Sequence, residues 1–211
     1  MCERFFIDGN NNIAEMRIIF AELKRHYSGT YEFLKLKKGE IFPSDTVPVI
    51  IPEKELRIDT VPMQWGIKGL NGKLIINARC EGVGQKSIFR DSINNKRCII
   101  PSNGFYEWAK APSGEKKEKY LIKPAQVPML YLAGIYEKLP DPVVAGKEQV
   151  RFVIMTKEAR GLIHSLHNRM PVAVERKDIL KWLNGNRSDI AEIFRDTKVP
   201  EYTFENLGVV G

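Results

Sequence analysis

The stretch RCIIPSNGFYEW, residues 97–108, decides the fold class. Its β-branched and aromatic residues predict two short strands, near 97–100 and 104–109, with a Pro-Ser-Asn joint between them. Similar apolar runs predict further strands near residues 48–52, 74–78, 120–123, 129–136 and 151–156. Apolar residues at helical spacing predict helices over 11–26, 157–166, 176–184 and 188–195.

Strands and helices do not alternate strictly along the chain, which argues against a doubly wound parallel sheet. We therefore expect an α+β fold. It should form a single domain over residues 1–211, with a mainly antiparallel, barrel-like β-sheet flanked by several helices.

The composition is ordinary for a water-soluble globular protein, with 43% hydrophobic and 28% charged residues in a chain of 211. The sequence has no run of about 18 apolar residues, so no membrane span is predicted. The first residues lack the basic and then apolar layout of a signal peptide. Three scattered cysteines (Cys2, Cys80 and Cys98) give no disulfide framework. We expect a cytoplasmic protein with reduced thiols and no membrane association.

The formal net charge of +7 favours a polyanionic partner, because cationic side chains that neutralise phosphates release counterions. The signal is weak by itself. Part of the excess lies in a solvated run of charges at residues 114–119.

Cys2 directly follows the initiator methionine. A side chain this small at position two permits removal of Met1, which leaves an α-amine and a thiol on the same residue. Such an aminothiol condenses with an aldehyde, first to an imine and then to a thiazolidine ring. An internal cysteine cannot react in this way, because its nitrogen is an amide. The alternative is that the small residue at position two is incidental.

Four other polar residues stand out from their surroundings. Asn77 ends an apolar run, where its amide would either cap a turn or orient a reacting group. Glu107 lies among aromatic residues, either as a desolvated general acid or on the solvent face of a strand. His167 precedes a Met-Pro pair that predicts a loop, where it would be catalytic or a surface residue. Arg4 would hold an anionic group of a substrate.

Other site chemistries find no support in the sequence. The Cys and His spacings match no zinc pattern, there is no nucleophile elbow for a Ser-His-Asp triad, and there is no Gly-rich phosphate loop. We expect no metal and no cofactor.

Seven short motifs resemble the SRAP (SOS response-associated peptidase) family, whose members crosslink to abasic sites in single-stranded DNA. In chain order they are MCERF (1–5), PMQWG (62–66), NARCE (77–81), SIFR (87–90), RCIIPSNGFYEW (97–108), AGIYE (133–137) and HNRMP (167–171). The resemblance covers about residues 1–175. The tail, residues 185–211, matches poorly.

The resemblance implies that Cys2 is the covalent nucleophile, that Asn77 positions it, that Glu107 is the acid and base, and that His167 assists proton transfer. It assigns phosphate contacts to Arg4, Arg79 and Arg169, and a hydroxyl contact to Thr156. It places Trp65 and Phe89 against bases that flank the lesion. The fold implied is the SRAP fold, and the partner is single-stranded DNA containing abasic sites, bound by a monomer in the cytoplasm near the nucleoid.

Two departures from the family pattern concern the site. Glu3 stands where the family usually has Gly, and Asn168 replaces the commoner Asp between His167 and Arg169.

Two other functions stay open from the sequence. One is a thiol peptidase with Cys2 as an N-terminal nucleophile, in which loss of Met1 would be autoproteolytic or the work of an aminopeptidase. The other is a single-stranded DNA-binding module that forms no covalent bond.

Overall fold

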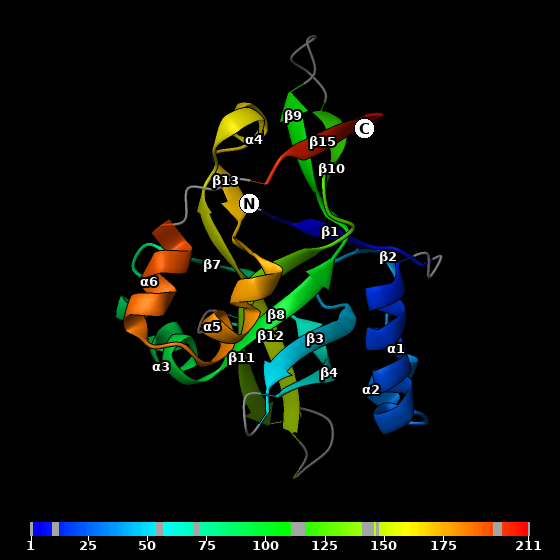
Figure 1. The fold of residues 1–211 in the computed structure, drawn as a ribbon, viewed down its shortest axis with the longest axis vertical. Helices are drawn as coiled ribbons and strands as arrows, with labels where there is room; N and C mark the ends of the chain where they lie inside the picture. Colours follow the sequence, from blue (N-terminus) through cyan, green and yellow to red (C-terminus); the bar gives the residue numbers. More distant parts are fainter. Residues whose placement is uncertain are drawn as a thin grey trace.

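Five strands close into a barrel at the centre of the fold (Figure 1). They are β3 (Thr46–Pro52), β4 (Ile58–Trp65), β8 (Arg97–Ser102), β11 (Leu130–Pro140) and β12 (Glu148–Glu158). Antiparallel pairs join β4 to β3, β3 to β8, β8 to β11 and β11 to β12, and a parallel pair of β12 with β4 closes the ring. The predicted α+β fold with a mainly antiparallel, barrel-like sheet is confirmed. This computed structural model describes residues 2–9, 13–53, 57–69, 72–110, 117–140, 146, 148–195 and 200–210.

A second, five-stranded sheet lies beside the barrel in the order β15, β10, β9, β1, β2. These strands are β15 (Tyr202–Val210), β10 (Lys117–Pro124), β9 (Gly104–Lys110), β1 (Arg4–Ile7) and β2 (Gly39–Ile41). The stretch 97–108 spans both sheets, since β8 belongs to the barrel and β9 to the second sheet. Asn103 fixes the junction: its amide oxygen accepts from the Asp8 nitrogen at 2.7 Å and its amide nitrogen donates to the Pro128 carbonyl at 3.0 Å.

Gly104 begins β9 at a point where no side chain fits. A Cβ at this position would lie 2.6 Å from the carbonyl oxygen of Ile122 on the neighbouring strand. Glycine therefore permits the close approach of β9 to β10 that sets the register of the second sheet.

Short strands and helices complete the fold. β5 (Ile67–Lys68) pairs with β6 (Leu74–Ile75), β7 (Asn77–Arg79) and β13 (Arg169–Pro171) pair with β12, and β14 (Ala173–Val174) pairs with β11. The helices are α1 (Ala14–Tyr27), α2 (Tyr31–Leu34), α3 (Ser87–Asn95), α4 (Gly161–Leu166), α5 (Ile179–Asn184) and α6 (Arg187–Arg195). Figure 1 shows α1 and α2 on one side of the barrel and α3, α5 and α6 on the other. Within the described ranges, we find no helix with the length and apolar character that a membrane crossing requires.

The predicted helix over 157–166 is wrong in its first half. Lys157 pairs with Met170 as part of β12, and the helix begins only at Gly161. Lys157 is buried, so its place is determined by the sheet rather than by helical propensity.

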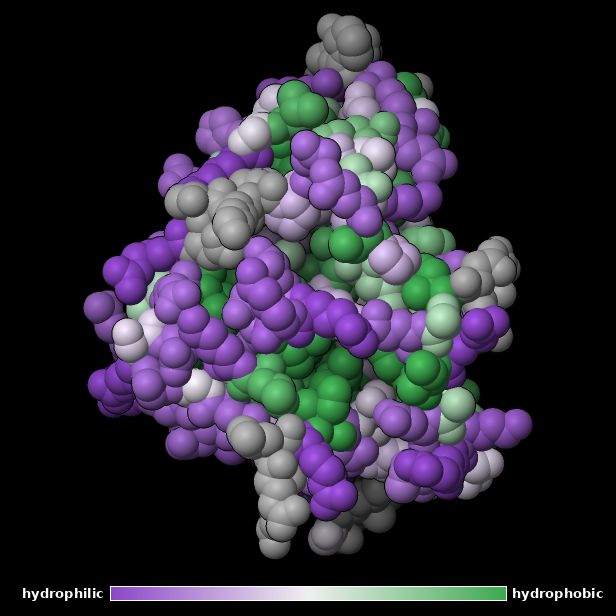
Figure 2. All heavy atoms as spheres, viewed as in Figure 1, coloured by the Kyte–Doolittle hydropathy of each residue, from purple (hydrophilic) through white to green (hydrophobic). Residues whose placement is uncertain are grey.

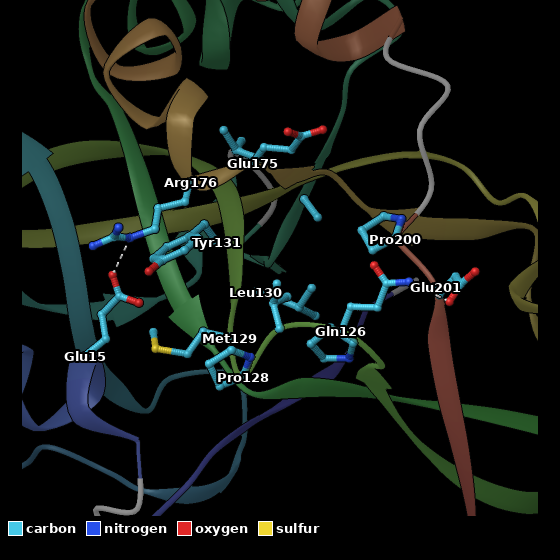
Figure 3. A pocket seen from close by; sticks show the side chains of 14 residues that line it. Glu15, Gln126, Pro128, Met129, Leu130, Tyr131, Glu175, Arg176, Pro200 and Glu201 are labelled. Carbon is cyan, nitrogen blue, oxygen red and sulfur yellow. Dashed lines mark hydrogen bonds and ion pairs between the residues drawn. The ribbon is translucent and has the colours of Figure 1, made fainter.

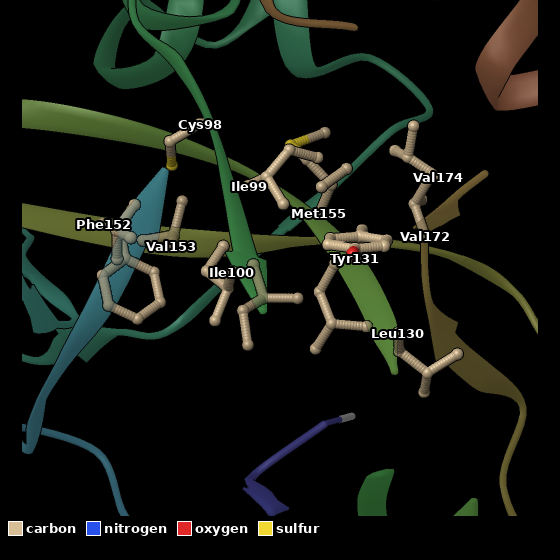
Figure 4. Packing of buried hydrophobic residues seen from close by; sticks show 14 of the residues in the cluster. Cys98, Ile99, Ile100, Leu130, Tyr131, Phe152, Val153, Met155, Val172 and Val174 are labelled. Carbon is tan, nitrogen blue, oxygen red and sulfur yellow. The ribbon is translucent and has the colours of Figure 1, made fainter. Parts of the chain in front are cut away.

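One apolar core serves both the barrel and the second sheet. Figure 4 shows Ile99 and Ile100 of β8 close to Val153 and Met155 of β12, and β11 pairs with both of these strands. On the surface in Figure 2, charged and polar side chains cover most of the view, and apolar side chains show in hollows near its centre.

The buried Arg97 ties two helices to the barrel. All its N–H groups donate to backbone carbonyls near the carboxyl ends of α3 and α5, at distances from 2.5 to 3.1 Å. A cation among the last carbonyls of a helix satisfies orphan acceptors and complements the helix dipole. Arg97 is therefore a structural residue.

Candidate active site

Cys2 lies two residues before Arg4, the first residue of β1, and is completely buried. Its thiol lies 3.6 Å from the carbonyl oxygen of Arg4, to which it donates. Burial raises the pKa of the Cys2 thiol well above its usual range, and the negative charge of Glu107 raises it further. The thiol is therefore neutral at pH 7. Met1 lies outside the described residues, and so its predicted removal does as well.

Asn77 holds the backbone of Cys2. It starts β7, whose parallel pairing with β12 sets Asn77 beside Ile154. The Asn77 amide nitrogen donates to the Cys2 carbonyl at 2.8 Å. Its amide oxygen is buried and has no hydrogen-bond partner among the described residues. A buried acceptor without a partner is costly, so this oxygen is suited to receive a donor that arrives with the chemistry.

Glu107 faces the protein interior from β9, with only 2% of its surface exposed. The solvent-face alternative for this residue is therefore wrong. Burial raises the pKa of the carboxyl to about 7, and the negative charge of Glu3 contributes in the same direction. A carboxyl that exchanges protons near neutral pH is suited to general acid and base catalysis.

His167 follows the last turn of α4 in an extended conformation. Its Nδ1 atom accepts a hydrogen bond from the backbone nitrogen of Arg169 at 2.9 Å, so the neutral ring carries its proton on Nε2. Burial lowers the pKa of His167, which keeps the ring neutral at pH 7. The negative charge of Glu3 raises the pKa of this ring, of the Cys2 thiol and of the Glu107 carboxyl. The three groups therefore lie around one site, near Glu3.

Arg169 already holds a carboxylate. Its two terminal nitrogens donate to the two oxygens of Glu81 at 3.0 and 2.8 Å, the fork geometry that a phosphate would also accept. These bonds lower the pKa of Glu81 to about 2. Arg169 also donates to the carbonyl of Thr156 at 2.6 Å, and the Thr156 hydroxyl is buried beside it. The structure thus brings Arg169 and Thr156 together.

Arg4 and Arg79 differ in how they are engaged. The Arg4 guanidinium lies 4.0 Å from the centre of the Phe42 ring, and its Nε is 3.7 Å from Glu40. Arg79 ends β7, and its exposed side chain makes no hydrogen bond or ion pair within the described part of the chain.

Trp65 and Phe89 belong to the core. Trp65 is completely buried, stacks on Phe152 and donates its indole N–H to the carbonyl of Ile76 at 2.9 Å, which braces the segment before Asn77. Phe89 is 3% exposed. Neither ring presents a face to a base in this structure, so the predicted base contacts at these two positions gain no support from it.

Glu81 is the residue that the sequence reasoning missed. It appears in the NARCE motif without a role, although an acid two residues after Arg79 and among expected phosphate contacts is a signal in itself. No cluster of three or more His, Cys, Asp or Glu side chains suited to a metal ion occurs in the described ranges.

A separate pocket of about 440 Å³ opens beside β11, β14 and the start of β15. Figure 3 shows Met129, Leu130 and Tyr131 there, with the ion pair of Arg176 and Glu15, 2.9 Å long, at one side. Its lining includes none of the predicted site residues, so this cavity is distinct from the site around Cys2.

Comparisons with known proteins agree on one family. A family model described as SOS response associated peptidase (SRAP) matches residues 1–207, which takes in most of the tail. The chain is 32% identical over 155 residues to Abasic site processing protein YoqW of Bacillus subtilis, covering 71% of this chain and 67% of that one. It is 25% identical over 163 residues to Abasic site processing protein YedK of Escherichia coli, covering 75% and 71%.

Solved structures share the fold. A protein from Bacteroides thetaiotaomicron matches with a TM-score of 0.76 at 24% identity, covering 96% of this chain and 91% of that one. A protein from Bordetella bronchiseptica matches with a TM-score of 0.73 at 16% identity over the whole of both chains.

Proposed function

Because the chain belongs to the SOS response associated peptidase (SRAP) family, we propose that it processes abasic sites in single-stranded DNA by crosslinking to them through Cys2. The relatives YoqW and YedK are named abasic site processing proteins, which supports the lesion as the substrate. The crosslink shields the lesion from cleavage and from further damage.

The observation that carries the proposal is the contact between Asn77 and Cys2. A side-chain amide fixes the carbonyl of the second residue of the chain, and the oxygen of the same amide is buried without a partner. Removal of Met1 gives Cys2 an α-amine, which is a donor of the kind that this oxygen lacks. The Asn77 side chain would then hold Cys2 at two points, its backbone carbonyl and its α-amine, and so fix the amine and the thiol in one orientation.

The proposed reaction uses both nucleophiles of the processed Cys2. Glu107 protonates the ring oxygen of the closed deoxyribose, the bond from that oxygen to C1 breaks, and the C1 hydroxyl loses its proton to water to give the aldehyde. The amine nitrogen attacks the aldehyde carbon and water leaves, giving an imine. The sulfur then adds to the same carbon while its proton passes to the nitrogen, which closes a thiazolidine. The second step is intramolecular, so it gains a large effective concentration.

The charge states of the site suit these steps. A Glu107 carboxyl with a pKa of about 7 is protonated often enough at neutral pH to act as an acid and can later act as a base. A neutral His167 with its proton on Nε2 can donate a hydrogen bond to the sulfur or to water during proton transfer. Arg79 offers an exposed cation to the backbone of the strand.

The test uses protein whose Met1 has been removed and single-stranded DNA with one abasic site. We expect an adduct that survives denaturing electrophoresis with wild-type protein and none with Cys2→Ala. Cys98→Ala is the matched control, because Cys98 is equally buried but lies in β8. A stable adduct from Cys2→Ala would refute the proposal, and turnover of an unrelated peptide would favour a thiol peptidase.

A further inference from the structure

The second sheet carries rings and cations together on one face. Antiparallel register places Arg4 opposite Tyr106 and Trp108 opposite Lys119, and cross-strand partners share a face. We call it the aromatic–basic face, defined by Arg4 and Phe6 of β1, Tyr106 and Trp108 of β9, and Lys119 and Lys123 of β10. Because side chains alternate along a strand, Glu107 points to the opposite face.

Each ring of this face lies beneath a cation. The Lys119 ammonium is 4.4 Å from the centre of the Tyr106 ring and 5.8 Å from that of Trp108. Lys123 lies 5.9 Å from the Phe6 ring. At the margin, the Arg4 guanidinium covers Phe42, which is 44% exposed. The cations thus keep the rings from forming a bare apolar patch.

Positive charge dominates the face. Lys110 and Lys117 form a cross-strand pair at its far end, and both are exposed. With Arg4, Lys119 and Lys123 they make five cations. Two acids oppose them among the described residues: Glu40, 2.5 Å from Lys119, and Glu205, 3.0 Å from Lys123. The face therefore carries an excess of three positive charges.

We propose that the aromatic–basic face binds the single strand that flanks the lesion. Phosphates would engage the lysines, and bases would stack on Trp108 and Phe42. Lysine stems are flexible, so an ammonium can leave a ring for a phosphate and expose the ring to a base. Interleaved cations and aromatic rings are the usual basis of sequence-tolerant single-strand binding.

The face shares strands β1 and β9 with the proposed reaction site. Arg4, on the face, is two residues from Cys2. Trp108 follows Glu107 in β9, and the two side chains lie on opposite sides of the sheet. A strand held on this face would therefore reach the nucleophile past Arg4, at the start of β1. The choice of single-stranded DNA as the occupant rests on the proposed function, and the face accounts for affinity that is independent of the crosslink.

Tryptophan fluorescence tests the proposal directly. Of the three tryptophans in the chain, Trp65 and Trp182 are completely buried, whereas Trp108 is partly exposed. Oligothymidylate without an abasic site, added to Cys2→Ala protein, should quench the emission, and Trp108→Phe should abolish that quenching. Binding detected by anisotropy without any quenching would overturn the proposal.

Lysine variants provide a test that does not depend on the tryptophan. Lys110→Gln with Lys117→Gln should lower the slope of log affinity against log salt by about 1.4, since each phosphate contact to a single strand contributes ~0.7. Arg17→Gln with Lys24→Gln removes the same charge from exposed positions of α1 and should leave the slope unchanged.

The outcomes separate this proposal from the proposed function. An equal change of slope in both variant pairs would overturn the aromatic–basic face, even if wild-type protein forms the crosslink. Quenching and a selective loss of slope would support the face, even if no crosslink forms. Tighter binding of duplex than of single-stranded DNA by the same protein would also overturn it, because paired bases cannot stack on the rings.

Discussion

Glu107→Gln should make the protein more stable at alkaline pH while it abolishes the proposed chemistry. The carboxyl is buried, and its pKa is raised from 4.5 to about 7. Ionising Glu107 therefore costs about 3 kcal/mol more in the folded protein than in the unfolded chain, at ~1.36 kcal/mol for each pH unit. Glutamine keeps the shape of the side chain and never ionises.

The pH dependence follows from the direction of the shift. Between pH 4.5 and 7 the folded state holds a proton that the unfolded chain has lost, so the stability of wild-type protein falls as the pH rises through this window. Above pH 7 Glu107 is ionised in both states, so it no longer changes the stability with pH. Glu107→Gln lacks this loss, so the difference in unfolding free energy between variant and wild type should grow by about 3 kcal/mol from pH 4.5 to pH 8.

Urea unfolding of both proteins at several pH values between 4.5 and 8 measures this difference. Groups that titrate equally in both proteins cancel in the comparison. Crosslinking to an abasic site should fall by about 10²-fold or more in the variant, as expected for loss of a general acid. Unfolding free energies that run parallel over the whole pH range would refute the assignment of a buried, raised-pKa carboxyl.

Three further variants test other parts of the account. Glu81→Gln should release the guanidinium of Arg169 for a phosphate and steepen the salt dependence of single-strand binding by about 0.7, whereas weaker binding in equilibrium titrations would make Glu81 a positioning residue. Arg97→Gln should lower the unfolding free energy by at least about 3 kcal/mol in urea, because buried carbonyls lose their donors; a change under 1 kcal/mol would contradict that role. Asn77→Ala should slow crosslinking by about 10²-fold in single-turnover gels without changing DNA affinity, since Cys2 would lose its orientation; an unchanged rate would remove Asn77 from the site.

The sequence predicts the buried strands of the fold well. Runs such as VPVII in β3 and CII in β8 are apolar on both faces, and the flanking turn residues favour strands for runs this short. The strands that the sequence analysis missed include β1, β2, β4 and β15, and the reasons differ for the two longest of these, β4 and β15. β4 has Pro62 inside it, which normally argues against a strand, and β15 is largely exposed, so only its pairing with β10 defines it.

The candidate site could be proposed from the sequence as a set of residues but not as an arrangement in space. Motifs identify Cys2, Asn77, Glu107 and His167, and the structure gathers them at the junction of the barrel and the second sheet. Long-range contacts such as that of Asn77 with Cys2, 75 residues apart, leave no local pattern in the sequence. The burial of Trp65 could not be read from the motif either, because an aromatic residue in a strand suits both a core and a nucleic-acid surface.

The most direct test of the central claim is the mass of the crosslinked N-terminal peptide, measured without any reducing agent. The account predicts the mass of the peptide that begins with Cys2 plus the abasic deoxyribose fragment, less one water. Cys2→Ser should give no stable adduct unless borohydride reduces its imine to an amine, which is two hydrogens heavier. An adduct on a lysine, or one that requires borohydride with wild-type protein, would contradict the thiazolidine chemistry proposed for Cys2.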